Sequence, residues 1–257
     1  MKNRSDIGRI FFGISMAVLG VLTIYQRDFP YMMIPPKHSW IPGLAGLASV
    51  FGILLVVAGA SIAFGKKARP ISLSLGALLL LIFCFYFIPY QLFVSSTHLV
   101  FGDWENAAKE LSLASGALVM AGCFSRKDET PYLNFLSKLI SIGTILFSIT
   151  IISYGIDHFL YASEAADYVP AWVPYHLFWM YFTGTALLGS GFAIILKIKV
   201  GMIASLLGAM IFSWVVMLHI PRIIVSASIY LSSEITSACL ALAYGGVAFV
   251  IAGLANK

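Results

Sequence analysis

The sequence predicts an all-α membrane protein with eight transmembrane helices, arranged as two parallel four-helix repeats. Three observations lead to this fold class: an apolar composition, eight apolar stretches of spanning length, and an internal repeat. Of the 257 residues, 60% are hydrophobic and 11% are charged, against about 25% charged residues in an average soluble domain. This leaves too little polar surface to cover a water-soluble globule, so lipid is the expected solvent.

Eight apolar stretches have the length of about 20 residues that a helix needs to cross a bilayer. They lie at residues 8–25, 43–64, 71–93, 107–124, 138–160, 174–196, 200–220 and 235–254. A helix satisfies its own backbone hydrogen bonds, whereas an open sheet leaves unpaired edges in hydrocarbon. The stretches are therefore predicted to be helices.

The second half of the chain repeats the first at a nearly constant offset in residue number. The pairs at an offset of 132 are Trp40 and Trp172, Pro42 and Pro174, Gly52 and Gly184, Gly59 and Gly191, Gly76 and Gly208, and Pro89 and Pro221. Gly8 and Gly20 recur as Gly143 and Gly155 at an offset of 135. An even number of helices per unit returns the chain to its starting side, so both copies have the same orientation. We expect the repeats at residues 1–126 and 127–257.

The basic residues predict the orientation in the membrane. Twelve lie on one side of the predicted helices: Lys2, Arg4, Arg9, Lys66, Lys67, Arg69, Arg126, Lys127, Lys138, Lys197, Lys199 and Lys257. Four lie on the other: Arg27, Lys37, Lys109 and Arg222. The positive-inside rule then places both termini in the cytoplasm. Because the cations are scattered and form no basic groove, no nucleic-acid partner is expected.

Eight residues are expected to have structural roles. They are Trp40, Pro42, Pro89, Trp172, Pro174, Gly184, Gly191 and Pro221. Each Trp-x-Pro sequence is expected to open the second helix of its repeat, with proline in the first turn and tryptophan at the lipid headgroups. The glycines, seven residues apart on one helix face, predict close helix contact. Pro221 is expected to kink the seventh helix, because proline donates no backbone hydrogen bond.

A few polar groups occur in the second half alone and are the candidates for function. Asp157 and His158 close the fifth predicted helix, whereas the first half has Leu22 and Thr23 there. His219 and Arg222 close the seventh, whereas the first half has Phe87 and Tyr90. With His176, the candidate binding residues are Asp157, His158, His176, His219 and Arg222. All five histidines fall on the non-cytoplasmic side. We therefore predict an outward-facing polar pocket in which Asp157 pairs with Arg222 or orients an imidazole.

Other chemistry has little support in the sequence. No G-x-S-x-G, H-E-x-x-H or phosphate-binding glycine loop is present, so no catalytic residue is assigned. The three cysteines show no C-x-x-C spacing, and no metal ligands are assigned. The acidic residues outside the cytoplasmic loops, Glu110 among them, are expected to be hydrated at the membrane surface.

Several short motifs resemble the DoxX-like (DoxX/DoxD) membrane protein family, here duplicated in tandem. In the second half these motifs are His158-Phe159, Val169-Pro170 with Trp172 and Pro174, Gly184 with Gly191, and residues 218–222. In the first half they are Trp104-Glu105-Asn106, Lys109-Glu110-Leu111 and residues 115–118. The resemblance implies one four-helix family unit per half and a location in a bacterial-type inner membrane. It also implies a link to quinone, since the family is named for a subunit associated with quinol oxidase and thiosulfate:quinone oxidoreductase.

Three functions remain open from the sequence. The first is a non-catalytic or accessory membrane component, namely a scaffold, an assembly factor or a small-solute carrier. The second is a quinone-linked redox component, in which His158, His219 and Arg222 donate hydrogen bonds to a quinone carbonyl. Such a component would meet a periplasmic or membrane redox partner, and if enzymatic it would be an accessory subunit of a quinone-linked oxidoreductase. The third, a haem protein with paired histidine ligands, is disfavoured because all five histidines lie at helix ends or in loops.

Overall fold

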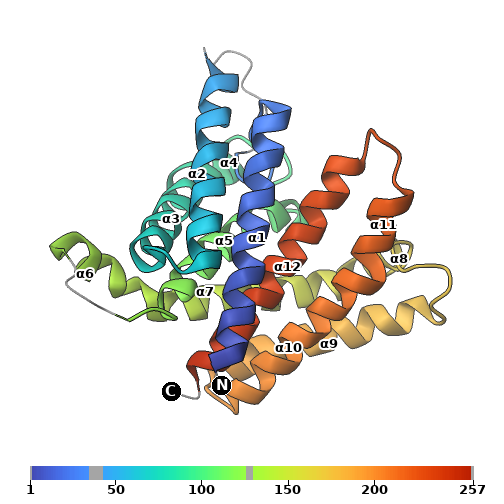
Figure 1. Cartoon of the computed structure of the whole chain (residues 1–257). Helices are drawn as coiled ribbons and strands as arrows, with labels where there is room; N and C mark the ends of the chain where they lie inside the picture. Colours follow the sequence, from blue (N-terminus) through green and yellow to red (C-terminus); the bar gives the residue numbers. More distant parts are fainter. Residues whose placement is uncertain (1, 35–42, 126–129, 256–257) are drawn as a thin grey trace.

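The computed structural model describes residues 2–34, 43–125 and 130–255, and every regular element within these ranges is helical (Figure 1). The elements in chain order are α1 (Lys2–Gln26), α2 (Leu44–Phe64), α3 (Ala68–Ile82), η1 (Phe83–Phe87), α4 (Ile88–Phe93), η2 (Phe101–Trp104), α5 (Glu105–Ala121), α6 (Pro131–Ser137), α7 (Leu139–Leu160), α8 (Ala162–Ala166), α9 (His176–Ile195), α10 (Val200–Trp214), η3 (Val215–His219), α11 (Ile220–Val225) and α12 (Leu231–Leu254). Trp40 and Pro42 lie outside the described residues.

Among the described residues, seven helical rods are long and apolar enough to cross a membrane. They are Arg4–Gln26, Leu44–Phe64, Ala68–Phe93, Pro131–Leu160, His176–Ile195, Val200–Val225 and Leu231–Leu254. The all-α, multi-pass architecture expected from the sequence is thereby confirmed. The remaining predicted span, 107–124, corresponds to α5, which has 17 residues and a length of about 26 Å at 1.5 Å per residue. Every residue from Glu110 to Ala121 is buried, so α5 is enclosed by the other helices.

The helices pack so that the two halves of the chain interlock. The helix α1 lies beside α2 (Figure 1) and packs on α12, and α7 packs on α9 and on α5. In the same way α3 packs on α5, and α10 packs on α12. The first helix of each half therefore packs against the last helix of the other half, and α5 and α12 meet between them.

The two halves also share the lengths of their elements. The helices α3 and α10, the π-helical turns η1 and η3, and the short helices α4 and α11 have equal lengths, and their first residues are related by the offset of 132. Left-handed backbone conformations follow the same offset, at Gly43 and Tyr175, at Gly65 and Lys197, and at Lys67 and Lys199. For these elements, the offset seen in the sequence also describes where each one begins and ends.

The irregularity expected at Pro221 takes the form of a π-helical turn directly before it. The Ile220 N–H bonds to the Val215 carbonyl, five residues back. In the first half the Ile88 N–H bonds to the Phe83 carbonyl in the same way, one residue before Pro89. A proline has no N–H to donate, and its ring clashes with the carbonyl four residues earlier, so a wider turn accommodates it.

Glycines bring the paired helices into close contact. A Cβ added at Gly52 of α2 would lie 2.7 Å from the Gly20 carbonyl oxygen of α1. A Cβ added at Gly184 of α9 would lie 3.2 Å from the Gly155 carbonyl oxygen of α7 and 2.9 Å from the His158 Cβ. Gly191 faces α7 as well, next to Ser148. Only glycine leaves room for backbones this close.

Basic residues bond to helix ends at the end of the bundle where the termini lie. Arg9 Nη1 donates to the Ile62 and Ala63 carbonyls at the end of α2, at 3.2 and 2.7 Å. Arg69 Nη1 donates to the Ala121 carbonyl at the end of α5, at 2.8 Å. Cations at helix C-termini satisfy free carbonyls and complement the helix dipole. The start of α1 and the end of α12 lie together at this end (Figure 1).

Candidate binding site

A cavity of about 910 Å³ lies at the end of the bundle away from the termini, mainly between helices of the second half. Its walls come from the start of α5, the last turns of α7, the start of α9, the rod from α10 through η3 to α11, and the first half of α12. The apolar lining consists mainly of Ile151, Met180, Leu187, Met210, Ile211, Leu218 and Leu240, with the aromatic residues Tyr154, Tyr168, Trp214, Tyr230 and Tyr244. The polar lining includes Glu105, Lys109, His158, Thr183, His219, Arg222, Ser233, Glu234 and Ser237. The cavity is therefore amphipathic.

The guanidinium of Arg222 pairs with the carboxylate of Glu234 across the connection between α11 and α12. Arg222 Nε donates to Oε2 at 2.8 Å, and Nη2 donates to Oε1 at 2.5 Å. The Arg222 side chain is 29% exposed and that of Glu234 15%. Arg222 Cζ also lies 4.5 Å from the ring centroid of Tyr168, within range of a cation–π interaction. Planar bidentate pairs of this kind are geometrically specific.

The predicted pairing of Asp157 with Arg222 is wrong. Arg222 is bound to Glu234, which lies nearby because the chain turns back between α11 and α12. Asp157 does not line the cavity, and its Oδ1 is buried without a hydrogen-bond partner. His176 begins α9 and is also absent from the lining. Of the five candidate residues, the structure brings His158, His219 and Arg222 together in the cavity wall.

The two histidines of the cavity differ in their surroundings. His158 Nδ1 lies 2.7 Å from the Tyr154 carbonyl oxygen, one turn back on α7. Since a carbonyl only accepts, Nδ1 carries the proton, and Nε2 is the acceptor in the neutral ring. His219 lies on the π-helical turn η3, and its Nδ1 is buried without a hydrogen-bond partner. A backbone carbonyl, and not the predicted carboxylate, therefore orients His158.

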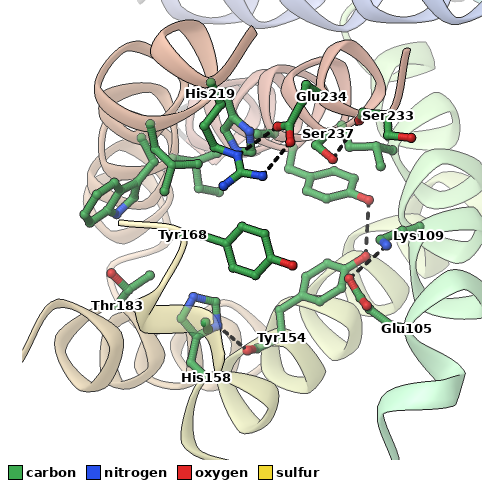
Figure 2. A pocket seen from close by; sticks show the side chains of 18 of the residues that line it. Glu105, Lys109, Tyr154, His158, Tyr168, Thr183, His219, Ser233, Glu234 and Ser237 are labelled. Atoms are coloured by element: carbon green, nitrogen blue, oxygen red, sulfur yellow. Dashed lines mark hydrogen bonds and ion pairs between the residues drawn. The ribbon is translucent and has the colours of Figure 1, made fainter. Parts of the chain in front are cut away.

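A second charged pair lies on the α5 wall of the cavity. Lys109 Nζ is 2.8 Å from Glu105 Oε1, an i,i+4 pair on one helix face. Figure 2 shows it beside Tyr154 and apart from Glu234. The charged residues that line the cavity are these two and Arg222 with Glu234. Each cation thus has an anionic partner, and the charged lining is formally neutral.

Two tyrosines join α7 to α12 beside these pairs. The hydroxyls of Tyr154 and Tyr244 are 3.2 Å apart, and their rings stack with centroids 5.7 Å apart. Deeper between α5 and α7, Ser112 Oγ donates to Thr150 Oγ1 at 2.8 Å. Tyr168, from the segment after α8, points into the cavity between His158 and His219 (Figure 2). Tyr154, Tyr168 and Tyr244 therefore contribute hydroxyl groups to the cavity wall.

The helix α5 also has a buried acidic residue, Glu110, in its second turn. Glu110 is fully buried, and neither carboxylate oxygen has a hydrogen-bond partner. The expectation that Glu110 is hydrated at the membrane surface is therefore wrong. The physical reason is that α5 is covered by α3, α7 and α12 along its length, so that even its second turn is enclosed.

Comparison with protein-family models, with curated proteins and with solved structures finds no match. The fold and the cavity nevertheless define a class: a multi-pass α-helical membrane protein with an amphipathic cavity at one end of its bundle. The resemblance to the DoxX-like family stays a prediction.

Proposed function

We propose that this protein is an accessory, non-catalytic membrane component that binds a small amphipathic molecule in the cavity, as a carrier or as a ligand-dependent scaffold or assembly factor. The cavity volume of about 910 Å³ is in the range of small-molecule sites, roughly 300 to 1,000 Å³. The apolar lining of α7, α9 and α10 suits an acyl or isoprenoid chain. The hydroxyls, imidazoles and ion pairs suit a polar headgroup. This amphipathic lining is the observation that carries the proposal.

The proposed setting is an inner membrane crossed eight times, with α5 as the fourth crossing and both termini in the cytoplasm. The equal lengths and common offset of α3 with α10, η1 with η3, and α4 with α11 support two parallel four-helix repeats. The arginine contacts at the ends of α2 and α5 support a common, cation-rich side. The cavity then opens on the outer side. Membership of the DoxX-like family is part of this proposal, on the motifs quoted above.

A cavity-filling substitution tests the binding function. We would purify the protein in nanodiscs made with its native lipids and identify co-purified molecules by native mass spectrometry. Ala241 lines the cavity, and Ala241→Phe should displace the bound molecule. Ala209, exposed on the outer face of α10, provides the matched control, because Ala209→Phe adds the same volume outside the cavity. Retention of the same molecule by both variants, or no bound molecule in the wild type, would contradict the proposal.

Quinone binding is the second candidate. It is favoured by the aromatic rings of Tyr154, Tyr168 and Trp214 together with the donors His219 and Arg222 in one cavity. A quinone ring stacks on aromatic side chains, and its two carbonyl oxygens accept hydrogen bonds. Decyl-ubiquinone should then quench the fluorescence of Trp214. The double variant His219→Leu, Arg222→Gln should lose this quenching and any quinone-dependent activity of the membranes. Unchanged activity in the double variant would exclude this candidate.

A further inference from the structure

The cavity lies in a region of the second half whose counterpart in the first half contains buried phenylalanines. At the offset of 132, Phe51 of α2 corresponds to Thr183 of α9, and Phe87 of η1 corresponds to His219 of η3. Each pair occupies matching helices in the two halves. The same offset therefore relates two buried aromatic residues of one half to two polar residues of the cavity wall in the other.

The phenylalanines close the matching region of the first half. Phe51 is 8% exposed and Phe87 2%. The Phe51 ring lies 5.5 Å from that of Phe29, and Met32 and Met33 are buried in the same core cluster as Phe51. In this half, aromatic and thioether side chains therefore take up the interior volume.

In the second half the replacements leave polar atoms without partners. Thr183 is 6% exposed, and its Oγ1 has no hydrogen-bond partner. Other helical hydroxyls bond back to a carbonyl, as Thr185 Oγ1 does to the Tyr181 carbonyl at 2.8 Å. His219 Nδ1 is buried and unpartnered as well. A buried polar atom without a partner costs free energy, and both residues line the cavity. Because both side chains line the cavity, a molecule bound there can supply the missing partner.

The charges of the lining indicate what that molecule is. Arg222 is bound to Glu234, and Lys109 is bound to Glu105, so no lining charge is left over for an ionic ligand. A charged headgroup would have to displace one of these partners or enter without a counterion, which is costly away from water. An uncharged headgroup meets neither cost.

We propose that Thr183 and His219 are the specificity-determining pair of this cavity, and that they hydrogen-bond the uncharged polar headgroup of an amphipathic ligand. The inference rests on the proposed binding function and adds the class of ligand and the residues that select it. The hydroxyl of Thr183 both donates and accepts, and the neutral ring of His219 has one donor and one acceptor nitrogen. A hydroxylated headgroup satisfies both side chains. The apolar chain then lies against Leu187, Ile211 and Leu240.

The test compares two probes of equal chain length in nanodiscs, by native mass spectrometry. The probes are 1-monolaurin, which is uncharged, and laurate, which is anionic. The wild type should bind 1-monolaurin about tenfold more tightly than laurate, and Thr183→Val should weaken 1-monolaurin binding by about tenfold. Thr183→Ser keeps the hydroxyl and should restore binding. Thr185→Val, on the exposed face of the same helix, is the matched control and should bind as the wild type does.

A double variant that carries the phenylalanines of the first half at both positions gives an independent test. Thr183→Phe with His219→Phe should abolish 1-monolaurin binding, yet the empty protein should unfold at the same or a higher temperature, because two unpartnered polar atoms are removed. A purely structural role for Thr183 and His219 predicts a lower temperature. If none of these substitutions changes the affinity for 1-monolaurin, or if laurate binds more tightly, this inference is overturned while the proposed binding function stands. Binding of neither probe and of no native lipid would overturn the proposed function with it.

Discussion

Arg222 and Glu234 hold α11 against the first turn of α12 through two parallel hydrogen bonds, of 2.8 and 2.5 Å. The pair stands 12 residues apart in the chain, on either side of the connection that closes one wall of the cavity. Because Tyr168 lies over the guanidinium, the pair also ties the segment after α8 to this wall. The Glu234 carboxylate and the Arg222 guanidinium therefore link three separate segments around the cavity.

The first prediction concerns this carboxylate. Glu234→Gln leaves the Arg222 guanidinium without its counterion in a partly buried site, so the free energy of unfolding should fall by about 1–3 kcal/mol. Thermal unfolding in nanodiscs measures the loss. Glu105→Gln is the control: it breaks the more exposed pair with Lys109, with Glu105 49% exposed, and should cost less than about 1 kcal/mol. A loss for Glu234→Gln no larger than that of the control would refute the structural role of the pair.

The second prediction concerns the close contact of α1 with α2. A Cβ at Gly59 would collide with the Gly13 carbonyl oxygen and with the backbone of Ala17. Gly59→Ala should therefore separate the two helices and lower the melting temperature. A Cβ at Gly189 of α9 meets no atom within 4 Å. Gly189→Ala should be neutral or stabilising, because alanine favours a helix by about 1 kcal/mol over glycine. Equal melting temperatures for the two variants would contradict the close packing.

The third prediction concerns Glu110. A fully buried carboxyl with no partner for either oxygen destabilises the fold, because an unsatisfied buried polar group costs about 1–3 kcal/mol. Glu110→Met should therefore raise the melting temperature of the purified protein. Glu105→Met, at the exposed start of the same helix, should leave it nearly unchanged. A clear loss of stability in Glu110→Met would mean that the carboxyl has a partner in the membrane, such as a bound water or cation.

Seven of the eight predicted membrane spans correspond to membrane-length helices among the described residues, because the signals for such helices are local. The expected stretch 138–160 corresponds to α7 at Leu139–Leu160, and the stretch 200–220 lies within the rod Val200–Val225. Apolar length and the glycine and proline pattern decide such elements within a single helix. The packing of α1 on α12 and of α7 on α5 joins different halves and has no comparable local signal.

The cavity could be predicted only in part, and the reason lies in the criterion used. Selecting polar residues found in one half alone gave His158, His219 and Arg222, but it passed over Glu234. The contacts of the packed glycines align α12 with α5 at an offset of 131. At this offset, the acidic residue Asp103 corresponds to Glu234. Both halves thus have an acid there. The same comparison would have found Thr183, since its counterpart is Phe51, had neutral residues been included with the charged ones.

The last prediction concerns orientation in the membrane. In a cysteine-free chain, single cysteines replace Ser96 and Ala227, which follow the third and seventh predicted helices, or Lys66 and Lys197, which follow the second and sixth. Parallel repeats with cytoplasmic termini place the first two positions outside and the last two inside, so an impermeant maleimide should label only the first two in intact cells. Permeabilised cells should show all four. Labelling of positions 96 and 197 together, without 227, would mean that the repeats are inverted and that the cavity opens to the cytoplasm. Since only the sides of the membrane differ between these outcomes, the labelling pattern decides which aqueous compartment the mouth of the cavity faces.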